Sequence, residues 1–307
     1  MRTTVLGFIL NIPKEVFWPY FGFIVGLGFG LFAVRKDIVK ARGLDKLITL
    51  APAFFAAPLT AFAAEHFVLT RSMLPLVPAW IPAHLFWILF VGVALLAAVL
   101  SIYLNRSVWL SATLLGVMFI LFVLLMDVPA IIAHPGNRFF WALAARELVF
   151  GSAALILAAT HTEQWRVNGK HWLIRLSALA IAIALIFYSV EHFLHPEFVP
   201  GVPLNKLMPT WVPLRSLWGY LTGIALALAG LSIVINQKSH IAVTALGLVI
   251  LLLVIFIYGP MMLATWTGDG SKIEGLNFFA DTLMFGGAAL ILAGVLPRVS
   301  EPGSFGI

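Results

Sequence analysis

The chain has 307 residues, of which 62% are hydrophobic and 10% are charged, and its mean hydropathy is +1.03. A soluble domain carries about 25% charged residues, so this composition excludes a soluble protein and indicates an integral membrane protein. The net charge of +6 does not indicate nucleic-acid binding, because the basic residues lie in short loops between apolar runs, where they set topology. The absence of cysteine excludes disulfide exchange, thiolate catalysis and iron–sulfur ligation.

The apolar runs predict about nine transmembrane helices, since about 20 apolar residues are needed to cross the hydrocarbon core of a bilayer. In chain order, these runs are Val16–Val34, Leu47–Val68, Ala83–Leu104, Val108–Met126, Phe139–Thr160, Trp172–Leu194, Leu214–Ile235, Ile241–Ala264 and Leu276–Leu296. The sequence therefore predicts an all-α polytopic membrane protein whose main partner is the lipid bilayer.

Basic residues predict the orientation of the helices. The densest basic stretch, Val34–Lys46, is expected in the cytoplasm, and alternation from there places the N-terminus outside and the C-terminus inside. We expect the protein in a bacterial cytoplasmic (inner) membrane. Two Glu-His pairs, Glu65-His66 and Glu191-His192, then lie near the outer ends of their helices.

The second half of the chain repeats the first, with polar and aromatic residues in the same order. The matching segments are Glu65–Phe67 with Glu191–Phe193, Pro78–Pro82 with Pro209–Pro213, Trp87 with Trp218, Gly92 with Gly223, Asn105 with Asn236, Pro129 with Pro260, and Phe150–Ala158 with Phe285–Ala293. Insertions fall only in the predicted outer loops, among them HPEFVPGVP from His195 onward.

This register divides the chain into three parts. Residues 1–46 form an N-terminal helix and basic loop, residues 47–164 the first four-helix repeat, and residues 165–307 the second repeat with a short tail. Because each repeat has an even number of helices, the two tandem bundles are parallel and an axis along the membrane normal is expected to relate them.

The Glu-His-Phe helix ends, the Pro-x-Trp-Val-Pro segment and the helix Trp218–Ile235 that follows it resemble the DoxX-like membrane proteins. The segments Ala145–Ala158 and Ala280–Gly294 are similar to the family's final helix. The resemblance covers about Leu47–Leu296 and implies two fused four-helix units. It also implies a redox-associated, quinone-linked subunit of a membrane complex or, if the protein is an enzyme, a subunit of a quinone-linked oxidoreductase. A non-enzymatic structural or assembly subunit and a small transporter stay open as alternatives.

The two Glu-His pairs are the first candidates for chemistry, because ionisable groups are rare within membrane helices and usually face the protein interior. Glu65, His66, Glu191 and His192 either join helices within each bundle or contact a quinone, where histidine donates a hydrogen bond and glutamate takes a proton. No metal site is assigned, although these four side chains become reasonable ligands if both pairs face the repeat axis. A haem held by His66 and His192, and a transport pathway, are further alternatives.

A second set of charges lies inside the apolar runs. The repeat register matches Arg146-Glu147 with Asp281-Thr282, and residues related by a two-fold axis approach each other near that axis. We therefore predict an ion pair between Arg146 and Asp281. The alternative is that Arg146 pairs with Glu65, Asp127 or Glu147 within its own repeat.

Two further motifs predict packing and anchoring. Trp80 and Trp211 are expected to anchor the outer interface, and the prolines around them are expected in the first turn of the following helix. Gly22, Gly26 and Gly30 line one helix face, where small residues allow close helix packing. This face is expected to contact either the repeats or another subunit of a membrane complex.

Overall fold

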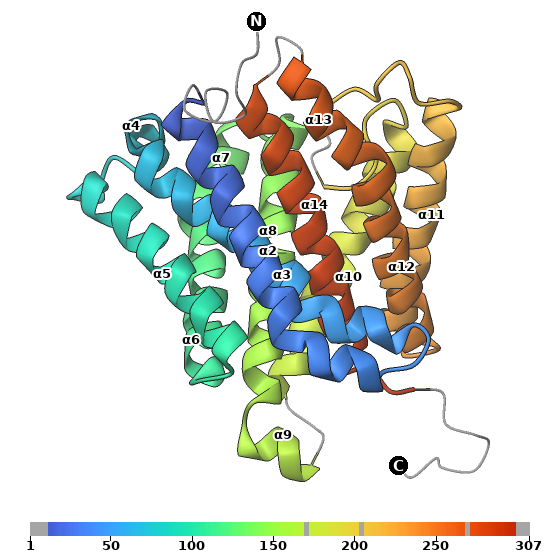
Figure 1. Cartoon of the computed structure of the whole chain (residues 1–307). Helices are drawn as coiled ribbons and strands as arrows, with labels where there is room; N and C mark the ends of the chain where they lie inside the picture. Colours follow the sequence, from blue (N-terminus) through green and yellow to red (C-terminus); the bar gives the residue numbers. More distant parts are fainter. Residues whose placement is uncertain (1–11, 169–171, 203–205, 268–270, 299–307) are drawn as a thin grey trace, which may run out of the picture.

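The computed structural model describes residues 12–168, 172–202, 206–267 and 271–298 (Figure 1). Within these ranges, nine apolar helical segments are long enough to cross a membrane. They are α2 (Lys14–Lys40), α3 (Asp45–Val68), α5 (His84–Leu104), α6 with η2 and α7 (Val108–Phe122, Val123–Asp127, Val128–Ala133), α8 (Arg138–Thr160), α10 (Trp172–Leu194), α11 (Arg215–Val234), α12 with η3 and α13 (Ser239–Leu253, Val254–Tyr258, Gly259–Thr267) and α14 (Lys272–Ala293).

The predicted all-α membrane architecture is confirmed, with small differences at the helix ends. Three short helices, α4 (Thr70–Met73), η1 (Leu74–Leu76) and α9 (Glu163–Asn168), lie in the connections. The last long helix begins at Lys272, earlier than the apolar run predicts, because the Ser271 hydroxyl accepts a hydrogen bond from the Glu274 N–H and caps its first turn.

The eight helices of the two repeats form a closed ring. Neighbouring helices pack in the order α3, α5, α6, α8, α10, α11, α12 and α14, and α14 packs against α3 to close the ring. Helices α8 and α14 also contact each other across its middle. The fourth helix of each repeat thus packs on the first helix of the other, so that the two bundles interlock.

The backbone supports the repeat at unusual positions. Six non-glycine residues of the described chain have positive φ angles, and they form three pairs in the repeat register: Ala83 with Leu214, Asn105 with Asn236, and Ser107 with Lys238. The π-helical turns η2 and η3 also correspond to each other, and each ends two residues before a proline, Pro129 or Pro260. Such turns are rare and cluster at functional sites.

The prolines of the Pro-x-Trp-x-Pro segments do not lie in the first helical turn, and that prediction is wrong. Helix α5 begins two residues after Pro82, because Ala83 takes a left-handed conformation with φ 58°. The Pro82 carbonyl instead accepts a hydrogen bond from Trp87 Nε1 at 3.1 Å, and the Pro213 carbonyl accepts one from Trp218 Nε1 at the same distance.

The glycine face of α2 packs on the chain itself. A side chain at Gly22 would lie 2.9 Å from the Thr60 carbonyl oxygen, and one at Gly26 would clash with the Thr60 side chain. At Gly30 the Tyr103 ring fills the same place. Of the two contacts expected for this face, the repeats or another subunit, the structure has the first, because α3 and α5 cover Gly22, Gly26 and Gly30.

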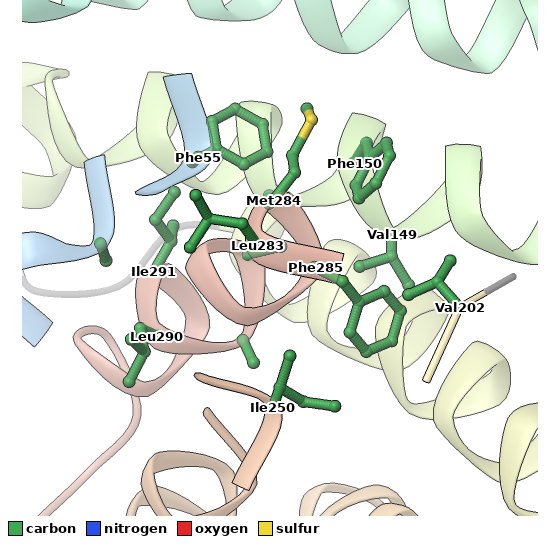
Figure 2. Close-up of a cluster of buried hydrophobic side chains, with 14 of the residues drawn as sticks. Phe55, Val149, Phe150, Val202, Ile250, Leu283, Met284, Phe285, Leu290 and Ile291 are labelled. Atoms are coloured by element: carbon green, nitrogen blue, oxygen red, sulfur yellow. The ribbon is translucent and has the colours of Figure 1, made fainter. Parts of the chain in front are cut away.

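The half of the ring away from the Glu-His pairs has an apolar core. Helix α14 is its centre, and every residue from Ala280 to Ala293 is buried. Figure 2 shows part of this core, with Phe55 from α3, Phe150 from α8 and Phe285 from α14 in one cluster. The buried charged residues Glu65, Asp127 and Asp281 lie toward the other end of the ring, which we call the Glu-His end.

Candidate functional site

The charged residues of α8 and α14 meet where these two helices cross the middle of the ring. Arg146 Nη1 donates to Asp281 Oδ2 at 2.6 Å, which is the pairing that the repeat register predicts. Arg146 Nη2 also lies 3.6 Å from Glu147 Oε1 in its own repeat. The guanidinium group therefore joins the two repeats, and both proposed pairings of Arg146 are present together.

The π-helical turn η2 brings Asp127 into this network. Asp127 is its last residue, and its carboxyl group lies near that of Glu147. The Asp127 residue is only 6% exposed. An extra residue in a helical turn rotates the following side chains, and here it points a carboxyl group at α8. Asp127, Glu147, Arg146 and Asp281 thus form one contiguous cluster.

The two glutamates of the Glu-His pairs cross to the opposite repeat. Asn277 Nδ2 of α14 donates to Glu65 Oε2 at 3.4 Å, and Glu65 also interacts electrostatically with Asp281. In the other repeat, Arg138 Nε of α8 donates to Glu191 Oε2 at 2.8 Å. Both contacts fasten the first helix of one repeat to the fourth helix of the other.

The two histidines have the same orientation but different surroundings. Nδ1 of His66 lies 2.7 Å from the Phe62 carbonyl, and Nδ1 of His192 lies 2.6 Å from the Tyr188 carbonyl. Because a carbonyl oxygen only accepts, Nδ1 carries the proton in each ring and Nε2 is left as an acceptor. His192 Nε2 accepts from the Gly201 N–H at 2.8 Å, whereas His66 Nε2 has no partner among the described residues.

These positions do not form a shared metal or haem site. The part of the chain that the structure describes holds no group of three or more His, Asp or Glu side chains arranged to bind a metal ion. His192 does not fit as an iron ligand, because Gly201 already occupies its Nε2. The bis-histidine arrangement is therefore not present, and Glu65 and Glu191 face different helices.

Several residues of the network were not predicted from the sequence. They are Asn277, Arg138, Tyr188, Tyr258 and Thr282. The Tyr188 hydroxyl donates to the Ala142 carbonyl at 2.7 Å. The Tyr258 hydroxyl donates to the Pro200 carbonyl at 2.8 Å. The register offered a signal for two of them, because Tyr258 corresponds to Asp127 and Thr282 to Glu147. Neutral residues at these places gave no reason to single them out.

The network holds more negative than positive groups. Three carboxyl groups, from Asp127, Glu147 and Asp281, surround the guanidinium group of Arg146, and a fourth, from Glu65, lies near Asp281. Glu65 Oε1, Asp127 Oδ2 and Glu147 Oε2 are buried and accept no hydrogen bond from any described residue. Buried polar atoms are normally paired, so these oxygens require a proton, a water molecule or a ligand.

A separate apolar groove lies between α2, α3 and α5. Its volume is about 480 Å³, and its walls include Trp18, Phe21, Phe29 and Phe67. Its two hydroxyl groups are engaged, since Thr60 donates to the Gly22 carbonyl and Tyr103 donates to the Ala53 carbonyl. The groove therefore fits the hydrocarbon chain of a lipid or quinone but offers no free donor to a quinone ring.

The predicted anchors lie outside the network. Trp80 is 71% exposed and Trp211 is 51% exposed, and both lie in the connections before α5 and α11. Their position suits an interfacial role and gives them no contact with the charged cluster.

Comparisons of the chain with known protein families, curated proteins and solved structures find no match. The functional argument therefore rests on the geometry of the network.

Proposed function

We propose that this protein is a proton-binding subunit of a redox-associated, quinone-linked membrane complex. The observation that supports proton binding is the charge imbalance of this cluster, in which three carboxyl groups surround one guanidinium group and Glu65 adds a fourth carboxyl group beside Asp281. Leaving charges unpaired inside a protein costs several kcal/mol each, so part of this charge must be neutralised. Asp127 and Glu147 face each other, and a single shared proton removes their repulsion, as in other carboxyl pairs.

Protons reach this network from one end only. Arg146 and Asp281 lie one helical turn before Phe150 and Phe285, which belong to the apolar core. Glu65 and Asn277 extend the polar groups toward the Glu-His end, which we predict to face the outside. The protein then stores or exchanges protons at that face without conducting them across the bilayer. Such a role suits a subunit beside a redox reaction that consumes or releases protons.

The redox and quinone part of the proposal rests on the resemblance to DoxX-like proteins, and the apolar groove supplies a place for an isoprenoid chain. Gentle purification followed by an optical spectrum, quinone extraction and identification of stoichiometric partner subunits tests it. We expect bound quinone or a redox partner. A preparation with neither one contradicts the quinone-linked part.

Infrared difference spectroscopy between acidic and neutral pH tests the proton-binding part. We expect a band from a buried carboxylic acid that disappears in Asp127→Asn and in Glu147→Gln. Glu274→Gln is the control, because Glu274 is exposed and pairs with Lys206. Identical carboxyl bands in the wild type and all three variants would contradict the proposal.

A non-enzymatic assembly subunit is the second candidate, and the second repeat favours it. Both Nε2 and Nδ1 of His192 are hydrogen-bonded, and Glu191 is paired with Arg138. The Glu191–Arg138 pair joins α10 to α8, the His192 contacts hold its ring to α10 and to the loop at Gly201, and none of these groups is left for a ligand. If the protein only supports assembly, Asp127→Asn and Glu147→Gln will leave the carboxyl spectrum unchanged and the complex fully active.

A further inference from the structure

Glu65 is a buried carboxyl group that forms no ion pair with any described residue. The residue is 5% exposed, and its hydrogen-bond partner is the neutral side chain of Asn277. The charged side chain that acts on it from a neighbouring helix is Asp281 of α14, which is itself acidic. An unpaired charge is costly to bury in a protein interior, and a negative charge on Glu65 would also repel Asp281. These surroundings disfavour an ionised Glu65.

The contact between Glu65 and Asn277 is incomplete when both groups are taken as they stand. Nδ2 of Asn277, one turn before Asp281 on α14, donates to Glu65 Oε2 at 3.4 Å. The other atom of each group, Oε1 of Glu65 and Oδ1 of Asn277, is buried and has no partner among the described residues. Both atoms are acceptors, so neither can satisfy the other without a hydrogen atom between them.

One proton on Glu65 supplies the missing donor. A protonated carboxyl group has one O–H donor and one carbonyl acceptor, which complement the carbonyl acceptor and N–H donors of an amide. With the proton on Oε1, the O–H can donate to Asn277 Oδ1 while the amide continues to donate to Oε2. The same proton removes the negative charge beside Asp281. A proton therefore satisfies both buried oxygens, and it needs no cavity.

The equivalent glutamate of the second repeat has a different partner. Glu191 Oε2 accepts from Arg138 Nε at 2.8 Å, and neither oxygen of Glu191 is a buried atom without a partner. A guanidinium group stays protonated in proteins and stabilises an ionised carboxylate. Glu65 and Glu191 thus occupy one position of the repeat register, but the first meets a neutral amide and the second meets a cation. This contrast predicts different charge states for the two carboxyl groups.

We propose that Glu65 holds a proton of its own at neutral pH and that Asn277 is the residue that positions it. This proton site is separate from the proton shared by Asp127 and Glu147. The inference deepens the proposed function and rests on it for the role of the proton. Glu65 and Asn277 extend the cluster toward the Glu-His end, so the proton on Glu65 is the one that the cluster exchanges first on that side.

Infrared spectroscopy of the full chain in lipid nanodiscs at neutral pH tests this site. We expect the difference spectrum between the wild type and Glu65→Gln to contain a carboxylic acid C=O band, which moves to lower frequency after equilibration in D2O. Glu191→Gln is the matched control at the equivalent position, and its difference spectrum is expected to contain a carboxylate band instead. In Asn277→Leu the acid band is expected at higher frequency, because the carbonyl loses its hydrogen bond from the amide.

Thermal unfolding supplies a second readout at the same two positions. Glutamine has the shape of a protonated glutamic acid and an N–H donor in place of the O–H, so Glu65→Gln keeps both contacts with Asn277. We expect its unfolding midpoint to equal that of the wild type. Glu191→Gln leaves Arg138 without its anion and is expected to unfold at a lower temperature. A loss in Glu65→Gln as large as that in Glu191→Gln would contradict a neutral Glu65.

Two infrared results overturn the proposal. A carboxylate band that is lost in Glu65→Gln shows that Glu65 is ionised and that a water molecule, not a proton, satisfies Oε1. An acid band that stays at the same frequency in Asn277→Leu removes the positioning role of Asn277. If Glu65→Gln does not fold, a carbon-13 label in the glutamate carboxyl groups of Glu147→Gln keeps the readout. Glu65 is then the glutamate that retains a buried, unpartnered oxygen among the described residues.

Failure of this site is distinguishable from failure of the proposed function. Glu65 keeps its proton at neutral and at acidic pH, so it does not contribute to the acid-minus-neutral spectrum that reports Asp127 and Glu147. If that spectrum contains their band while Glu65→Gln removes no acid band, the Glu65 site fails and the proton-binding function stands. If Glu65→Gln removes an acid band while Asp127→Asn and Glu147→Gln change nothing, the Glu65 site stands and the shared proton fails.

Discussion

Arg146 and Asp281 occupy the same position in the two repeats and meet each other in the middle of the ring, with Nη1 and Oδ2 2.6 Å apart. When two copies of a duplicated helix pack on either side of the repeat axis, the same position in each copy faces its counterpart. Opposite charges at one such position convert a symmetric contact into an attractive one. The pair thus fixes how α8 and α14 cross.

Neutralising Arg146 is predicted to cost more stability than neutralising Asp281. Arg146→Gln leaves Asp281, Glu147 and Asp127 without the one cation that the described residues give them, while Asp281→Asn leaves Arg146 still paired with Glu147. Removing one partner of a buried pair costs about 3–5 kcal/mol, and we expect Arg146→Gln at the upper end. Thermal unfolding in detergent measures the order, and a larger loss for Asp281→Asn would contradict it.

Exchanging the charges tests the direct contact between the two repeats. The double variant Arg146→Asp with Asp281→Arg is expected to recover part of the stability that each single reversal loses. Additive losses in the double variant would count against the pair.

Glycine substitutions in α2 are predicted to separate packing from helix propensity. Gly26→Ala places a methyl group against Thr60, so we expect a loss of about 1–3 kcal/mol and weaker docking of α2 on α3. Gly28→Ala is the matched control on the same helix, because nothing lies within 4 Å of its Cβ position. Thermal unfolding of both variants checks this, and equal effects would argue against close packing at Gly26.

The two histidines are predicted to differ in their contribution to stability. His192→Ala leaves the buried Gly201 N–H without an acceptor, which costs about 1–3 kcal/mol. His66→Ala removes only a hydrogen bond within its own helix and is expected to cost less. Unfolding midpoints of the two variants measure the difference. A His66→Ala variant that is as unstable as His192→Ala would show that the first repeat is equally complete.

The predicted orientation is testable with single cysteines, because the chain has none of its own. Ser72→Cys lies in the connection before α5, and Gln164→Cys lies in α9 at the opposite end of the ring; both positions are exposed. A membrane-impermeant maleimide applied to intact cells is expected to label Ser72→Cys only. Labelling of Gln164→Cys alone would reverse the topology.

Sequence reasoning predicted the helices well because each one is a continuous apolar run. It predicted the register of the repeats because polar residues such as Asn105 and Asn236 recur in the same order between these apolar runs. The Arg146–Asp281 contact followed from the register and from symmetry. The interlocking of the repeats did not follow, since apolar faces of similar composition do not specify which helix covers them.

The contrast between the two Glu-His pairs was also beyond the sequence. The pairs Glu65-His66 and Glu191-His192 have the same sequence. The burial of the inserted residues 199–202 against His192 distinguishes them. The length of the insertion was visible, but whether a loop folds inward depends on its contacts, here the Tyr258 hydroxyl and Gly201 with φ 122°. Glycine reaches such a φ angle without steric strain.

The most direct test compares the accessibility of corresponding positions in the two repeats. Glu147→Cys and Thr282→Cys are treated with a small thiol reagent that carries an ammonium group, with Ser72→Cys as an exposed control. If the first repeat is open at its carboxyl groups and the second is closed by residues 199–202, Glu147→Cys will react from the Glu-His end and Thr282→Cys will not. Equal reaction at both positions, or none at Glu147→Cys while Ser72→Cys is labelled, would contradict the account.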